Sequence, residues 1–333
     1  MIRIPFEEMI SEFRRVLEKI GFTPSRAEFC ARILAENTLD GVASHGVNRF
    51  QLFVNRVKRG KMDPNAEPEK IASFGAWEQW DGKLGPGPLN AAFCTDRAIE
   101  LSKEFGIGCV ALRHTTHWMR GGTYGWRAAN AGFAFIGWTN TMPNMPSWGA
   151  KDCRIGNNPL VLAMPREKGH VVLDMAMSQF SYGKMETMHL LGKELPLIGG
   201  FDTKGNLTKD PDEILKSWRP LPIGYWKGSG LSIMLDIFAA VLSNGLATYQ
   251  IGKLDDEYHL SQIFIVIDVE RTAMREELNK MVDGIIEDLH SGQPDKEDGE
   301  ILYPGERALH TRKENLKNGI PVDEGIWKKI LEM

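Results

Sequence analysis

The motif richest in chemical groups lies near the N-terminal end, where Ser44-His45-Gly46-Val47-Asn48-Arg49 opens a stretch with helical spacing. Hydride reduction of a ketone leaves an alkoxide, and an imidazolium is a suitable proton donor for it. An arginine can hold a substrate carboxylate through two hydrogen bonds. If the helix has begun by residue 45, His45 and Arg49 share one face. In the alternative interpretation, Ser44 caps the helix, and His45 and Arg49 face solvent.

A second motif spans residues 113–124 and follows an apolar run that is typical of a buried strand. Loops at strand ends commonly bind ligands in α/β proteins, so we expect His117, beside an arginine and Gly121-Gly122, to contact substrate or phosphate. His114 and His117 could instead share a metal ion, although no third ligand stands nearby in the sequence. In the simplest interpretation the glycine pair is a turn before the next helix.

A third motif, Tyr225-Trp226-Lys227-Gly228-Ser229-Gly230, precedes a strongly apolar helical stretch. Free backbone N–H groups at a helix N-terminus, together with Lys227, would form an anion site. Trp226 offers a ring on which a ligand could stack. The alternative is that Ser229 caps the helix and that Lys227 is solvated.

Two weaker candidates lie further apart in the chain. Residues 170–176 form an apolar strand that carries Asp174, which could accept hydrogen bonds from ribose hydroxyls or cap the turn that follows. Pro304-Gly305-Glu306-Arg307 is a turn whose charged residues indicate nothing by themselves.

The usual nucleotide-binding motifs are absent from the sequence. Residues 106–111, Gly-Ile-Gly-Cys-Val-Ala, approach the GxGxxG pattern, but these glycines precede a strand and no helix start follows them. Residues 226–230 lack the spacing of a Walker A loop. A dinucleotide would therefore bind to this chain without a Rossmann fold.

Hydrophobic spacing predicts the elements that must position these motifs, and it favours a mixed α/β core between two helical ends. Helices are expected within residues 5–60 (one over about 47–59) and at 124–130, 228–244 and 272–289. Strands are expected at 109–112, 133–138, 160–164, 171–173 and 263–269. Residues 291–300 are expected to be a surface loop, and 301–333 to return as helix and pack on the first helices.

Composition excludes several classes of protein. Of 333 residues, 42% are hydrophobic and 25% charged, which suffices for a sizeable core without disulfide or metal support. The net charge of -4 disfavours a nucleic-acid binder. Four widely spaced cysteines form no CxxC pair, and glutamates interrupt the first apolar residues. We therefore expect a cytoplasmic protein with no membrane-spanning helix.

Several uncommon runs, in the same order along essentially the whole chain, resemble the malate/L-lactate dehydrogenase type-2 family. They are SHGVNRF at 44–50, HWMRGGTYGW at 117–126, WGAKDCRIGNNP at 148–159, FDTKGNLTKDP at 201–211 and GYWKGSG at 224–230. The resemblance implies a mixed-sheet NAD(P)-binding fold that is not a Rossmann fold. It also implies a helical part made of residues 1–65 and 301–333, which carries the catalytic histidine, and an α/β cofactor-binding part made of residues 66–300.

The resemblance also assigns site residues and disfavours the metal site. The general acid corresponds to His45, with Ser44 orienting it, carboxylate binding corresponds to Arg49, and His117 lines the substrate pocket. The cofactor-binding positions are His170, Val171, Val172, Leu173, Asp174, Met175, Ala176, Trp226, Lys227, Gly305, Glu306 and Arg307. The implied cofactor is NAD, as NADH with NADPH as an alternative, and the implied assembly is a homodimer with its active site near the subunit interface.

The implied function is reduction of a small 2-oxo acid by hydride transfer, with a 2,3-diketo sugar acid as the first expectation. The same chemistry on malate or lactate, ureidoglycolate or a cyclic imino acid is the alternative. A non-catalytic sugar-acid-binding protein is a third hypothesis, but His45 and Lys227 are both present.

Overall fold

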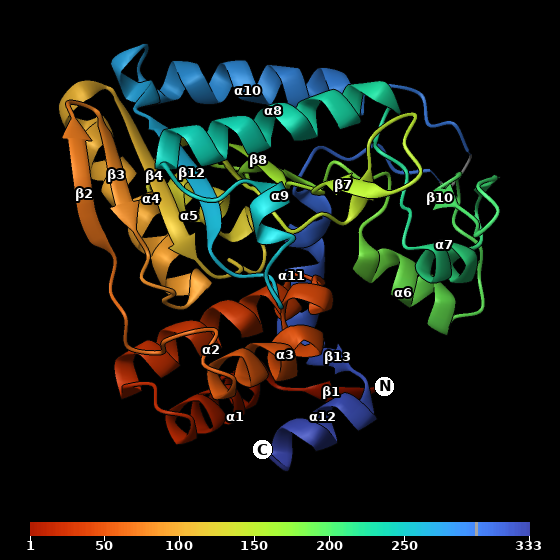
Figure 1. The fold of residues 1–333 in the computed structure, drawn as a ribbon. Helices are drawn as coiled ribbons and strands as arrows, with labels where there is room; N and C mark the ends of the chain where they lie inside the picture. Colours follow the sequence, from red (N-terminus) through yellow and green to blue (C-terminus); the bar gives the residue numbers. More distant parts are fainter. Residues whose placement is uncertain (297–298) are drawn as a thin grey trace.

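A seven-stranded mixed sheet lies at the centre of the computed structural model, which describes residues 1–296 and 299–333 (Figure 1). The strand order is β2-β3-β4-β12-β5-β8-β9. Strands β3 and β4 run parallel, whereas the other neighbours run antiparallel. The strands are β2 (Glu69–Phe74), β3 (Trp77–Asp81), β4 (Ile107–Thr115), β5 (Ala134–Thr139), β8 (Leu160–Met164), β9 (Val171–Met175) and β12 (Leu260–Ile267).

Helices cover both faces of the sheet. α4 (Gly87–Phe105) and α5 (Gly122–Asn130) pack on one face, and α8 (Trp226–Ser243) packs on the other. Successive residues of a strand point to opposite faces. Accordingly, Val110 of β4 lies in the core beneath α4, whereas Ala111 lies in the core beneath α8.

The two ends of the chain share a second core. It contains α1 (Phe6–Lys19), α2 (Pro24–Leu39) and α3 (Val47–Lys58), together with β13 (Ile320–Val322) and α12 (Glu324–Leu331). β1 (Ile2–Ile4) pairs with β13, and α11 (Glu306–Asn318) leads from the sheet toward this core (Figure 1). The expected packing of N- and C-terminal helices is confirmed.

The remaining elements are short or peripheral. Residues 178–222, which we call the outer lobe, have a small core of their own around Met185, Leu195 and Ile214. The outer lobe contains α6 (Tyr182–Leu190), β10 (Gly200–Phe201), β11 (Leu207–Thr208) and α7 (Pro211–Ser217). The other peripheral elements are β6 (Met145–Pro146), β7 (Cys153–Ile155), α9 (Thr248–Ile251) and α10 (Arg275–His290). No helix among the described residues has the length and apolar character needed to cross a bilayer.

The predicted fold class is confirmed, because the sheet is mixed and has helices on both faces. Strand 160–164 is found where the sequence predicted it, whereas β2, β3 and α4 were missed. β2 is exposed along most of its length, so its hydrophobic pattern is weak. α4 buries small residues such as Ala91 and Ala98, which give little amphipathic contrast. The division into parts at residues 65 and 300 stays a prediction, and residues 297–298 of the expected loop lie outside the described residues.

Phe50 provides a test of the terminal core. Its ring stacks on Phe13 with 4.2 Å between ring centres and joins α3 to α1. We expect Phe50→Ala to lower the free energy of unfolding by about 3–5 kcal/mol, as for other buried aromatic residues. The measurement is urea unfolding followed by circular dichroism. Leu52→Ala, on the exposed side of the same helix, is the control and should cost less than about 1 kcal/mol. Equal losses in the two variants would contradict this packing.

Candidate active site

His45 lies at the end of a short 3-10 turn, Ala43–His45, and α3 begins only at Val47. Gly46 separates the two, with φ -130° and ψ -116°, so the expectation that His45 and Arg49 share one helix is wrong. Thr38 Oγ1 accepts the Val47 N–H at 3.0 Å, a role that the alternative interpretation gave to Ser44. A Cβ at position 46 would lie 2.1 Å from this oxygen, so the close approach requires glycine.

The structure brings His45 and His117 together, with their ring centres 5.7 Å apart. Ser44 Oγ lies 3.0 Å from His45 Nδ1, which leaves Nε2 for a ligand. The Met119 N–H donates to His117 Nδ1 at 2.9 Å. Neutral His117 therefore carries its proton on Nε2 and can donate a hydrogen bond from there.

Both imidazoles are surrounded by protein and by cations. Burial, followed by the charges of Arg49 and Arg120, lowers the pKa of His45 to about 3. Burial and the charge of Arg49 also hold the pKa of His117 well below its usual range. Both side chains are therefore neutral at pH 7 while no anionic ligand offsets the arginines.

Arg49, on α3, acts electrostatically on both histidines, and about a quarter of its side chain (27%) is exposed. Its Nη2 atom lies 3.7 Å from Glu257 Oε2. Burial, with a further contribution from Arg56, lowers the pKa of Arg49, whereas Glu257 acts in the opposite direction. A guanidinium can bind a carboxylate through two parallel hydrogen bonds. Arg49 could therefore hold the carboxylate of an acid beside His45.

The outer lobe lies close to Ser44, the neighbour of His45 in the chain. Gly183, in the first turn of α6, lies so close to Ser44 that a Cβ there would be 2.5 Å from Ser44 Cβ. Glu186 on the same helix acts electrostatically on Arg49. The outer lobe thus forms one wall beside His45 and Arg49.

Arg120 lies in the loop between β4 and α5. The sequence indicated only that an arginine stands beside His117 in this loop. Its side chain is buried and forms an ion pair with Asp40 at the end of α2. Its charge acts on His45 and also on Asp174 of β9. Asp174 Oδ2 accepts the Gly122 N–H at 2.7 Å, at the start of α5. Asp174 therefore does not cap the turn after β9, since Ser181 caps α6 there.

The predicted cofactor-binding stretches lie along β9, the edge strand of the sheet. Near its start, the Val172 N–H donates to Pro304 O at 2.8 Å. Just beyond its end, the Ile223 N–H donates to Met177 O, also at 2.8 Å. These bonds bring the segments containing residues 305–307 and 226–227 to opposite ends of strand 171–175. Gly305, at φ +98°, begins α11 against β9, where a Cβ would lie 3.1 Å from Val172 N.

The prediction of an anion site at the start of α8 is wrong about the backbone N–H groups. The N–H groups of Lys227, Gly228 and Ser229 already donate to carbonyls of residues 223–225, so these three are not free for phosphate. Trp226 and Lys227 are exposed, with Lys227 Nζ 5.9 Å from the Trp226 ring centre. Ser229 is not a cap either, because it lies inside α8 and its hydroxyl accepts the Trp148 N–H.

The other predicted cofactor residues differ in their partners. Glu306 Oε2 lies 3.0 Å from His290 Nε2 and accepts the Tyr303 N–H at 3.1 Å. Arg307 is exposed. His170 Nδ1 accepts the Arg166 N–H at 3.0 Å, and its ring lies beside Trp126 with 5.8 Å between ring centres.

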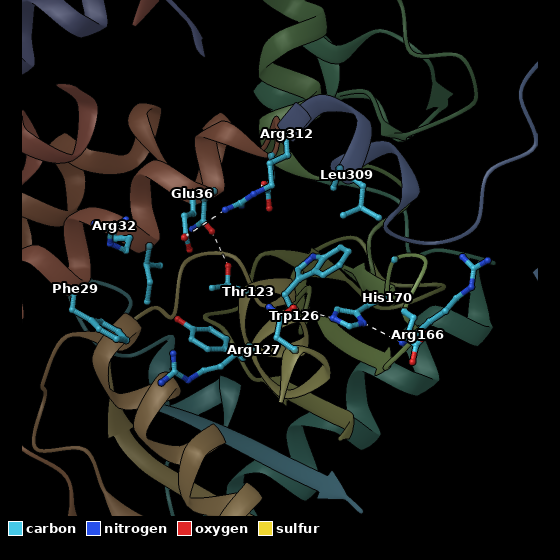
Figure 2. A pocket seen from close by; sticks show the side chains of 18 residues that line it. Phe29, Arg32, Glu36, Thr123, Trp126, Arg127, Arg166, His170, Leu309 and Arg312 are labelled. Carbon is cyan, nitrogen blue, oxygen red and sulfur yellow. Dashed lines mark hydrogen bonds and ion pairs between the residues drawn. The ribbon is translucent and has the colours of Figure 1, made fainter. Parts of the chain in front are cut away.

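A cavity of about 650 Å³ opens between α2, α5, the β8–β9 loop and the first turns of α11 (Figure 2). Trp126 and His170 supply aromatic surface, and Arg127, Arg166 and Arg312 supply positive charge at its walls. Asn37 and Thr123 also line it, and the Asn37 amide donates to His45 O at 2.9 Å. The cavity therefore extends from the start of β9 to the back of the His45 turn.

The metal hypothesis finds no support in the partners of His114. Its Nδ1 atom lies 2.9 Å from Asp81 Oδ2, and its ring packs against His259. His117 has a different partner, the Met119 N–H. Within residues 1–296 and 299–333, no three His, Cys, Asp or Glu side chains are grouped to hold a metal ion.

A family model described as malate/L-lactate dehydrogenase matches residues 4–331. The chain belongs to the malate/L-lactate dehydrogenase family. The resemblance seen in the sequence runs is therefore confirmed, and so is the expectation of an oxidoreductase that uses a nicotinamide cofactor.

Similarity extends over the full length of several relatives. The 2,3-diketo-L-gulonate reductase of Citrobacter koseri is 46% identical over 330 residues, which are 99% of each chain. The malate dehydrogenase structure from Pyrococcus horikoshii OT3 aligns with a TM-score of 0.90 and 29% identity, over 99% of this chain and 94% of that one. The sulfolactate dehydrogenase structure from Methanocaldococcus jannaschii aligns with a TM-score of 0.91 and 27% identity, over 99% of this chain and 96% of that one.

Proposed function

We propose that this protein reduces 2,3-diketo-L-gulonate to 3-dehydro-L-gulonate with NADH. The observation that carries the proposal is the pairing of His45 with His117 beside Arg49, in a chain that is 46% identical to a 2,3-diketo-L-gulonate reductase. The same chemistry on malate is the second candidate, favoured by the structural similarity to a malate dehydrogenase.

Three side chains act on the substrate in this proposal. Arg49 binds the carboxylate and orients the neighbouring carbonyl group. His117 donates its Nε2–H to the carbonyl oxygen, a tautomer that the bond from the Met119 N–H favours. His45 protonates the oxygen as it becomes an alkoxide, with Ser44 orienting the ring through Nδ1.

Substrate binding supplies the protonation state that catalysis requires. The pKa of His45 is lowered to about 3 by burial, Arg49 and Arg120. A carboxylate bound to Arg49 offsets one of these cations, which raises the pKa of His45 in the complex. Proton uptake is thereby linked to binding of the acid.

The residues along β9 fit a dinucleotide. When bound, the cofactor supplies the hydride. β9 has five residues, which correspond to a length of about 16 Å at 3.3 Å per residue. We place the adenosine end in the cavity, where Trp126 and His170 offer aromatic surface for the adenine ring. Asp174 to Ala176, with Trp226 and Lys227, hold the other end, near Arg120.

We further propose a cytoplasmic homodimer. The outer face of α8 carries exposed Leu231, Ile237, Phe238 and Val241, an apolar surface that supports contact with a second subunit. Sedimentation equilibrium at micromolar concentration should give a dimer, and Phe238→Glu should shift it toward monomer. A wild-type monomer under these conditions would contradict the proposal.

The substrate is tested by following NADH oxidation at 340 nm with a panel of 2-oxo acids. We expect the highest kcat/KM with 2,3-diketo-L-gulonate, and lower values with oxaloacetate, pyruvate and a cyclic imino acid. NADPH in place of NADH tests the cofactor preference. If oxaloacetate is the best substrate, the malate candidate replaces the sugar acid. Tight binding of diketogulonate with no oxidation of either cofactor would support a non-catalytic binding protein.

The role of His45 as proton donor is tested in the same assay with the variant His45→Ala. Loss of a positioned proton donor should lower kcat by about two to four orders of magnitude. Lys329→Ala, on the exposed side of α12, serves as a variant with unchanged activity. A kcat close to wild type in His45→Ala would remove this residue from the mechanism.

The pH dependence follows from the lowered pKa of His45, which is about 3 in the free protein. Reduction needs the protonated ring, and kcat/KM reports ionisation of the free enzyme, so it should fall by up to about tenfold per pH unit between about pH 5 and 8. Oxidation of the 2-hydroxy acid needs the neutral ring, so its kcat/KM should stay flat over this range. A reduction profile that is flat up to pH 7 would show that the free-enzyme pKa is not lowered.

A further inference from the structure

The guanidinium of Arg49 is held mainly by charge. Among the described residues its Nε–H has no hydrogen-bond partner, although this atom is shielded from solvent. Its ion-pair partner is Glu257, with 3.7 Å between Nη2 and Oε2. Glu257 is almost fully buried, with 8% of its side chain exposed, whereas 27% of the Arg49 side chain is accessible. The position of the guanidinium therefore depends on the attraction of Glu257.

The two residues that precede Glu257 fasten its segment to α3 and to the turn that follows this helix. Asp256 Oδ1 accepts a hydrogen bond from Arg56 Nη2 at 2.9 Å. Asp255 pairs with Lys61, just beyond the end of α3, at 2.7 Å. The segment therefore presents Glu257 to the same helix that carries Arg49.

A second arginine lies beside the same carboxylate. Arg56 Nη2 also lies 3.7 Å from Glu257 Oε2, and only 4% of the Arg56 side chain is exposed. The positive charge of Arg56 repels that of Arg49 and lowers the pKa of Arg49, whereas Glu257 raises this pKa. Like charges repel strongly where water is excluded. Without Glu257, Arg49 would be pushed away from Arg56 and out of its place beside the histidines.

We propose that Glu257 is a positioning residue that holds the Arg49 guanidinium where it binds the carboxylate of the 2-oxo acid. This inference rests on the proposed function, which gives Arg49 its ligand. Glu257 also has an opposite effect, because its negative charge repels an anionic substrate. The two effects predict opposite changes in KM when the charge is removed. If positioning dominates, KM rises, and if repulsion dominates, KM falls.

The experiment compares E257Q and E257D with wild type, using the best 2-oxo acid from the panel and its uncharged carboxamide. We expect E257Q to raise KM for the acid by about tenfold or more, since small misplacements of a binding group are costly. KM for NADH and for the carboxamide should stay within about twofold of wild type, because Arg49 forms a charge-assisted bond with neither. E257D keeps the charge at a longer distance, so its KM for the acid should lie between those of E257Q and wild type.

E67Q is the control, because it removes one negative charge from an exposed side chain that forms no ion pair with the described residues and does not touch the segment carrying Glu257. Its KM for the acid should equal that of wild type. An unchanged or lower KM for the acid in E257Q overturns the inference, as does a parallel rise for acid, carboxamide and NADH. If E257Q does not fold, a wild-type KM in E257D overturns it. Failure of the proposed function looks different, since wild type would then reduce another 2-oxo acid better than 2,3-diketo-L-gulonate, or none at all.

Discussion

The ion pairs of Asp40 are the interaction on which the arrangement of the site depends. Asp40 stands at the end of α2, pairs with Arg120 of the β4–α5 loop and accepts a hydrogen bond from Arg312 of α11 at 2.9 Å. Asp40 and Arg120 are both about nine-tenths buried, and separation of such a pair leaves an uncompensated charge that costs about 3–5 kcal/mol. The terminal helices, the sheet and α11 are thereby joined at one point, next to His45.

The same ion pair also links electrostatics to chemistry. Arg120 is fixed by Asp40, and from that position its charge acts on both His45 and Asp174. Arg49 acts on His45 from α3. The histidine is therefore neutral until an anion enters, and the acid that is to be reduced is itself such an anion. In the proposed mechanism the two arginines couple binding to protonation, and no dedicated carboxylate beside the imidazole is needed.

β9 explains how a chain without a Rossmann motif can arrange a cofactor site. As an edge strand it has one side free of strand pairing, and two loops bond to that side, Pro304 near its start and Ile223 just beyond its end. Each loop leads directly into a helix, α11 or α8. Three stretches that are distant in the sequence therefore meet at one strand, and in the proposed cofactor site they take the place of the single glycine-rich turn of a Rossmann fold.

The sequence by itself determined the family, the mixed α/β class and several core strands, and it indicated His45, Arg49 and His117 as candidate site residues, because hydrophobic spacing and short motifs are local properties. Tertiary structure decided the rest. Only the fold shows that Gly46 separates His45 from α3, that N–H groups at the start of α8 are already bonded, and that the charge of Arg120 acts on both His45 and Asp174. Glu257 lies 208 residues from Arg49 in the sequence, as the numbering shows. The pKa of a group depends on charges and burial supplied by distant segments, and no local pattern in the sequence records which segments those are.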